Sequence, residues 1–211
     1  MKFFASARSK MSLLLSVFLL SSFPLSATLI KIDSIRKAND LYMARGTSRD
    51  GLENVREAIK IYDSEIKNFD DPYKKAILYL KSVKASFFLG EQTSNTKMKR
   101  KIFKEGHEKA QKGYLLLQEG DHLGISRNDD ERTKDLLGRL YYWYGASLGR
   151  WGEARGIVSS LSKWNDLRKH MDAVIKLGQE RVVSYGVYRL LGRAYHRMPA
   201  PFGNKKKSQS R

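Results

Sequence analysis

Arginine recurs at helical spacing in two segments in the second half of the chain. In the later segment Arg189, Arg193 and Arg197 follow one another every four residues. Residues four apart lie on the same face of an α-helix, so a helix here presents three guanidinium groups to one side. A guanidinium binds carboxylate or phosphate through a planar fork of N–H donors. The pattern predicts a site for a small anionic ligand, and a solvated basic face is the alternative.

The earlier segment is predicted to complete this site. Aligning Leu191-Gly192 and Tyr144-Gly145 with the Leu-Gly positions of a helical repeat brings further side chains to the adjoining inner face. His196 falls beside the arginines of the later segment. The predicted ligand-binding residues are Arg139, Tyr142, Arg150, Arg189, Arg193 and Arg197.

No sequence pattern indicates catalysis, a metal site or a cofactor. The chain has no Cys, which removes thiol chemistry and Cys-ligated metals. It has no GxSxG, P-loop, HExxH or GxGxxG motif. Its four His residues are scattered, without the pair four residues apart that holds a metal on one helix face. The chain is therefore predicted not to be an enzyme and to need no cofactor.

The segment "LYYWYGASLGRWGEARG", residues 140–156, combines aromatic residues with regularly spaced glycines. Glycine inside a helix costs ~1 kcal/mol relative to alanine, so its recurrence needs a compensating gain. Close approach of a neighbouring helix is the simplest gain. We expect Tyr144 and Trp151 to pack in a core, and a ligand wall is the main alternative. A platform that stacks nucleic-acid bases is not expected, because no RNP-type aromatic run is present.

The chain of 211 residues begins with the pattern of a secretory signal. Lys2, Arg8 and Lys10 precede an apolar run that ends in "LSA", so residues 1–27 are predicted to be a cleaved signal peptide. The run is short for a membrane span, which needs ~20 residues. The net charge is +18, and this segment carries three basic and no acidic residues, so 28–211 carry +15. Such a charge favours an anionic partner, and export argues against nucleic acid.

Apolar residues recur every three to four positions through most of residues 28–211, and no segment alternates as a strand does. The protein is therefore predicted to be all-α, with antiparallel helix pairs in one domain over 28–211. Asp50 is a candidate N-cap for the second helix. The expected helices span residues 33–46, 50–69, 73–90, 96–120, 129–151, 161–177 and 186–198.

Signs of a tetratricopeptide-like repeat mark these helices. Ala58 with Tyr62 and Ala110 with Tyr114 match the A-x-x-x-F/Y of a second repeat helix. Leu191-Gly192 with Tyr195 matches the L-G-x-x-Y of a first helix. The intervals are irregular. Such a unit leaves an apolar face that its neighbour covers, which predicts an α-solenoid or bundle.

The second half resembles the TRAP transporter T-component (TatT-like) family. The resemblance covers residues 136–208 and lies in "LYYWYGASLGRWGEARG", "SKWNDLRKHMDAVIKL" and "GVYRLLGRAYHRMPAPFGNKKKS". It implies a periplasmic bundle of tetratricopeptide-like pairs with a partly apolar cavity, frequently self-associating, that accompanies a substrate-binding protein. Family members are commonly lipoproteins, whereas this signal has no Cys for a lipid. In the family F-G-x-K-K opens a further helix, so the chain is expected to be C-terminally truncated.

Two functions are therefore predicted. The first is an exported, periplasmic or secreted, non-enzymatic accessory of a TRAP-type carboxylate uptake system. Its partners would be a periplasmic substrate-binding protein, a small anionic or amphipathic ligand, and further copies of itself. The alternative is a general periplasmic scaffold that binds acidic proteins or membrane surfaces through its basic charge.

Overall fold

The computed structural model describes residues 23–119, 130–156 and 161–197. Within these ranges the protein is helical and contains no strand, which confirms the predicted all-α class. The predicted signal peptide lies outside the described residues up to residue 22, and so do the Met198-Pro199 stop and the FGNKKKS segment at 202–208. The helices are α2 (Phe23–Met43), α3 (Arg49–Glu65), η1 (Ile66–Asn68), α4 (Pro72–Gln92), α5 (Thr96–Glu119), α6 (Glu131–Arg155), α8 (Trp164–Lys176) and α9 (Gly186–Arg197).

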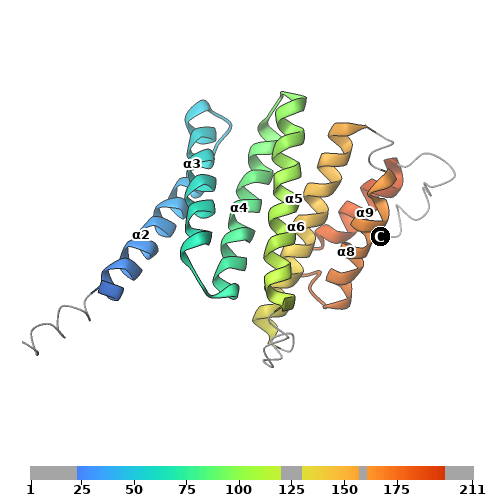
Figure 1. The fold of residues 1–211 in the computed structure, drawn as a ribbon. Coiled ribbons are helices and arrows are strands. Elements are labelled where there is room, and N and C mark those ends of the chain that lie inside the picture. Colours follow the sequence, from blue (N-terminus) through green and yellow to red (C-terminus); the bar gives the residue numbers. More distant parts are fainter. Residues whose placement is uncertain (1–22, 120–129, 157–160, 198–211) are drawn as a thin grey trace, which may run out of the picture.

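The helices follow one another along one axis, from α2 at one end to α9 at the other, and from α2 to α6 successive helices reverse direction (Figure 1). Alternate helices also touch. Lys81 on α4 donates a 2.8 Å hydrogen bond to Asn39 on α2, α4 contacts α6, and α6 contacts α9. On the other side Lys109 on α5 forms a 2.6 Å ion pair with Asp63 on α3. One layer therefore contains α2, α4, α6 and α9, and the other contains α3, α5 and α8.

The predicted helix ends are correct to within about four residues except at the first helix, which begins at Phe23 and not at residue 33. Two further ends differ for a clear physical reason. Ser48, and not Asp50, is the N-cap of α3, because its hydroxyl accepts the Gly51 N–H at 3.1 Å. Helix α6 does not stop at Trp151 but continues to Arg155, where Gly156 ends it with a φ of 103°. That backbone conformation is easily adopted only by glycine.

The positions that marked the repeats are buried. Ala58 with Tyr62, Ala110 with Tyr114, and Leu191 with Tyr195 are all less than 9% exposed. Small residues at the alanine positions allow the facing helices to approach, and the tyrosine one turn later fills the space beside them. These residues belong to two core clusters, one around α2 and α3 and a larger one that extends from α4 to α9.

The regularly spaced glycines of α6 face α8 and the segment that follows it. A Cβ atom on Gly145 would lie 2.5 Å from Met171 Cε, and one on Gly138 would lie 2.6 Å from Gln179 Cβ. On Gly149 it would lie 3.3 Å from Leu167 Cδ1. The expected close approach of a neighbouring helix is thus confirmed at Gly145 and Gly149, which face α8, whereas Gly138 faces the segment after α8.

No helix in the ranges that the structure describes is both long and apolar enough to cross a membrane.

Candidate functional site

A cleft of about 390 Å³ lies where α4, α6, α8 and α9 come together. Ala146, Gly149 and Gly152 form part of its wall, one helical turn apart on α6, and their small size leaves the space open. Larger apolar side chains line the remaining walls. They are Phe87 from α4, Leu148 from α6, Leu161 just before α8, Trp164 and Leu167 from α8, and Leu190 from α9.

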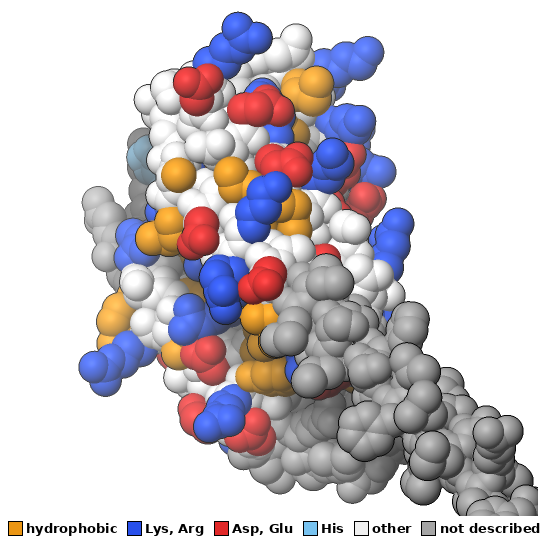
Figure 2. All heavy atoms as spheres, turned by 90° about the vertical axis from the view of Figure 1, so that its left-hand side faces the viewer, with side chains coloured by type: hydrophobic (Ala, Val, Ile, Leu, Met, Phe, Trp, Pro, Cys, Tyr) orange, Lys and Arg blue, Asp and Glu red, His pale blue; other side chains and the backbone are white. Residues whose placement is uncertain are grey.

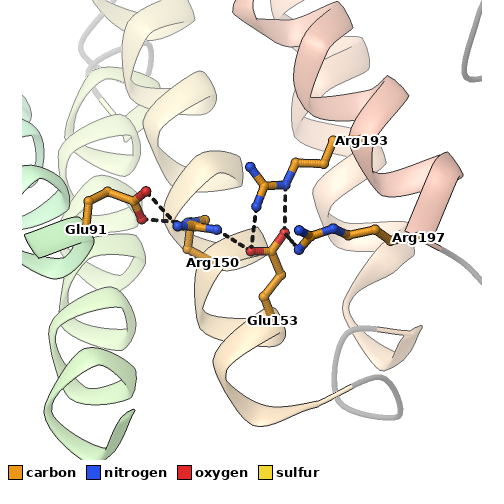
Figure 3. Close-up of polar contacts among 5 residues, drawn as sticks. All are labelled: Glu91, Arg150, Glu153, Arg193 and Arg197. Carbon is orange, nitrogen blue, oxygen red and sulfur yellow. Dashed lines mark hydrogen bonds and ion pairs between the residues drawn. The ribbon is translucent and has the colours of Figure 1, made fainter. Parts of the chain in front are cut away.

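A network of arginines and carboxylates lines the polar side of the cleft (Figure 3). Arg150 donates two hydrogen bonds of 2.6 Å to the carboxylate of Glu91, which lies across on α4. It also bonds Glu153, one turn further along α6. Arg193 and Arg197 reach the same Glu153 carboxylate from α9, with Nε–Oε1 at 3.0 Å and Nη1–Oε1 at 2.7 Å. Three guanidinium groups therefore converge on one carboxylate, and the network joins α4, α6 and α9.

The members of this network differ in their exposure to solvent. The side chain of Arg150 is 24% exposed, whereas those of Arg193 and Arg197 are 50% and 54% exposed. Burial disfavours the charged form of Arg150, but the hydrogen bonds that it donates to Glu91 and the charge of Glu153 outweigh burial and raise the pKa of the guanidinium. Arg150 therefore has a structural role in joining α4 to α6, while the two arginines of α9 can exchange their bonds to Glu153 for hydrogen bonds to water.

The cleft as a whole is positive. Its lining contains five cationic side chains and two carboxylates, a net charge of +3. Arg189 and Lys163 belong to this lining, and neither forms an ion pair with a carboxylate among the described residues. Arg189 donates a 2.7 Å hydrogen bond to the backbone oxygen of Ser184, which fixes the turn that enters α9.

Tyr142 forms the wall between α6 and the start of α9. A Cβ on Gly186, the first residue of α9, would lie 2.5 Å from the Tyr142 hydroxyl oxygen, so only glycine fits there without displacing the ring. Burial raises the pKa of the Tyr142 hydroxyl, partly offset by the charge of Arg189. The phenol is therefore neutral and can donate a hydrogen bond.

The structure brings five of the six predicted site residues together. Tyr142, Arg150, Arg189, Arg193 and Arg197 all line the cleft. The sixth, Arg139, lies outside it and binds Asp135 on its own helix at 2.8 Å. It precedes Arg150 by three helical turns, about 16 Å along α6, which is too far for one small site. His196 is exposed and is not part of the lining.

The sequence interpretation missed the acidic partners. Glu153 follows Arg150 by three residues, a spacing at which opposite charges pair on a helix, so local pattern could have found it. Glu91 lies 59 residues before Arg150, and no local signal links the two. Trp164 was also missed, since its role depends on where α8 docks. Among the described residues, no group of three His, Asp or Glu side chains is placed to hold a metal ion.

The aromatic segment of α6 divides between core and cleft. Tyr141 and Tyr144 are buried in the larger core cluster, and Trp151 packs partly buried against it. Tyr142 lines the cleft. The core interpretation is therefore confirmed for Tyr144, and the ligand-wall alternative fits the position of Tyr142.

No protein-family model matches this sequence, and no curated protein is similar to it.

Proposed function

We propose that this protein is a non-enzymatic helical-repeat binding protein whose cleft takes a small amphipathic anion. One observation supports this most directly: three arginines converge on a single carboxylate at the edge of an apolar cleft. The ligand's carboxylate would be bound by Arg193 and Arg197. Its apolar part would lie against Trp164, Leu167 and Leu190.

Arginine is suited to this task because its fork binds both oxygens of a carboxylate. Glu153 already occupies the position between the forks that such a carboxylate would take. A ligand therefore binds either by joining the network on the exposed side of Arg193 and Arg197 or by displacing Glu153 from them. A ligand that displaces Glu153 must compete with it for the two guanidinium groups, and a ligand that joins the network is repelled by its negative charge. In both cases Glu153 weakens binding.

The biological setting that we propose rests on the family resemblance of residues 136–208. It is an exported, periplasmic accessory of a TRAP-type carboxylate uptake system, with a substrate-binding protein as partner. A cleft that combines arginines with apolar walls agrees with an organic carboxylate as cargo. The predicted export signal at residues 1–27 agrees with this setting as well.

The alternative is a scaffold that binds acidic surfaces through charge, and the net charge of +18 favours it. The end of the molecule formed by α2 and α3, however, mixes acidic and basic side chains over its surface (Figure 2). Exposed ion pairs occur on these two helices, Arg36–Asp33 on α2 and Arg56–Glu53 on α3. A mixed surface gives a weak field, which makes the cleft the more specific feature.

The test uses octanoate as the probe and the neutral octanamide as its control, with isothermal titration calorimetry. We expect octanoate to bind and octanamide to bind at least tenfold more weakly. Arg193→Lys should weaken octanoate binding because the ammonium lacks the fork. Arg193→Ala should weaken it further, by about fivefold in total, since a half-exposed ion pair contributes ~1 kcal/mol at most.

Lys67→Ala is the matched control, because Lys67 is an exposed cation in η1 at the other end of the stack. If Lys67→Ala weakens binding as much as Arg193→Ala does, only a diffuse positive field acts and the scaffold alternative stands. The variant Glu153→Gln tests independently whether Glu153 weakens binding. It removes the competing charge and should strengthen octanoate binding, and unchanged binding would contradict the proposed competition. Binding to the cleft should persist at 0.15 M salt, where the Debye length is ~8 Å and surface attraction is largely screened.

A further inference from the structure

A second group of cations lies on α4, on α6 and just after α2, beyond the end of the cleft that Phe87 forms. Helices α4 and α6 meet at successive levels. Glu91 pairs with Arg150 in the cleft, and the rings of Phe87 and Trp143 meet edge to face, with centroids 5.1 Å apart. Lys84 precedes Phe87 by three residues on α4 and Arg139 precedes Trp143 by four on α6, so both lie about one helical turn before this aromatic contact, at the same level of the two helices. Two cations therefore share this level, whereas the next level holds an aromatic contact and the level after that holds an ion pair.

Two more cations lie close to this level, one just after α2 and one a helical turn before Lys84 on α4. The Arg45 guanidinium, just after α2, lies 5.8 Å from the centroid of Phe88, which is one turn beyond Lys84 on α4. Lys81 is one turn before Lys84 on the same face of α4. Arg45, Lys81 and Arg139 therefore lie within about one helical turn of Lys84 along this layer.

The surroundings of Lys84 differ from those of the other half-buried cations. Lys109, whose side chain is 18% exposed, is paired with Asp63, and Arg150 is paired with two carboxylates. Lys84 has no hydrogen bond or ion pair with any residue that the structure describes. Burial lowers the pKa of Lys84, and the charges of Arg139, Lys81 and Arg45 lower it further. A cation held in this way is stabilised by any anion that reaches it.

Arg139 has a hydrogen-bond donor group that such an anion can use. Its Nε and Nη2 bind Asp135 at 2.8 and 3.3 Å, and its Nη1 bonds no residue in the described part of the chain. Asp135 neutralises one of the four positive charges, which leaves a local net charge of +3. A compact dianion satisfies these donors better than a single carboxylate, because it offers three or four acceptor oxygens at one point.

We propose that Lys84 and Arg139, with Lys81 and Arg45 beside them, form a binding site for a phosphate-type oxyanion. The site is separate from the cleft, whose lining includes neither Lys84 nor Arg139. It goes beyond the proposed function, because it adds an anion position on the same layer at the α2 side of the cleft.

The experiment follows Lys84 directly. The full protein is reductively methylated with ¹³C-formaldehyde, which keeps the lysine charge, and the dimethyl-lysine signals are recorded by NMR. Loss of one signal in Lys84→Arg assigns Lys84, and Lys67→Arg assigns an exposed reference. Sodium phosphate is then added against sodium chloride at constant ionic strength. We expect the Lys84 signal to shift saturably and its pKa to rise in phosphate, while the Lys67 signal stays in place.

Two variants locate the effect. Arg139→Gln should raise the phosphate dissociation constant read from the Lys84 signal about fivefold, and Arg193→Ala, in the cleft, should leave it unchanged. A Lys84 signal that does not saturate, or that moves in parallel with Lys67, would overturn the site. Because octanoate binding is measured separately, the cleft and the oxyanion site can fail independently of each other.

Discussion

Shortening the side chain of Tyr144 in two steps separates a packing role from a ligand-binding role. Tyr144 is 5% exposed, and the centroid of its ring lies 4.0 Å from the ring centroid of His170 and 5.8 Å from that of Tyr114. Its hydroxyl donates a 2.6 Å hydrogen bond to Asp166. Burial, then the hydrogen bond and charge of Asp166, raise the pKa of this hydroxyl, so it remains a donor over the whole working range of pH.

The two substitutions remove different parts of these contacts. Tyr144→Phe removes only the hydroxyl, and the partly exposed Asp166 can bind water instead, so the expected cost is ~1 kcal/mol of unfolding free energy. Tyr144→Ala also empties the space between α5, α6 and α8, and truncating a buried aromatic typically costs ~3–5 kcal/mol. For a chain of this size ~1 kcal/mol shifts the melting temperature by about 2–4 °C. We expect a fall of about 3 °C for the first variant and about 10 °C or more for the second.

Thermal unfolding followed by circular dichroism measures both shifts, and octanoate calorimetry on the folded variants measures binding. Tyr144 is not part of the cleft lining, so Tyr144→Phe should bind octanoate as the unchanged protein does. A melting temperature within about 1 °C of the original for Tyr144→Ala would refute the packing argument. Loss of binding in Tyr144→Phe at intact stability would replace it with the ligand-wall interpretation.

Two further predictions follow from the core and the cleft. Gly186→Ala should destabilise the fold by ~1–3 kcal/mol in urea unfolding, because its Cβ would lie 2.5–2.7 Å from three atoms of the Tyr142 side chain. Gly149→Ala, whose Cβ meets only Leu167 at 3.3 Å, should cost less, and equal losses would contradict the steric reason. Burial lowers the pKa of His170, so the unfolded state binds protons first and stability should fall as pH drops below ~6.5. His170→Gln should lose less stability between pH 7.5 and 5.5, and an equal loss would refute this.

The local properties of the chain determine much of the fold. The spacing of apolar residues predicted the helices, because each helix buries one continuous face. That face consists of apolar residues three and four positions apart. The pairs Ala58 with Tyr62 and Ala110 with Tyr114 marked packing positions for the same reason. The glycines of α6 indicated a close neighbour, because glycine in a helix interior is costly unless something occupies the space that a side chain would take.

Tertiary structure decided how the arginines are divided and which carboxylates meet them. Helical phase showed that they share a face, but distance along the axis separates Arg139 from Arg150 and places Arg139 at the level of Lys84 on α4. The pairing of Glu91 with Arg150 joins residues 59 apart, through the contact of α4 with α6. Such contacts depend on how whole helices dock. Docking is set by the sum of many side-chain volumes across an interface, and no local pattern of residues carries that sum.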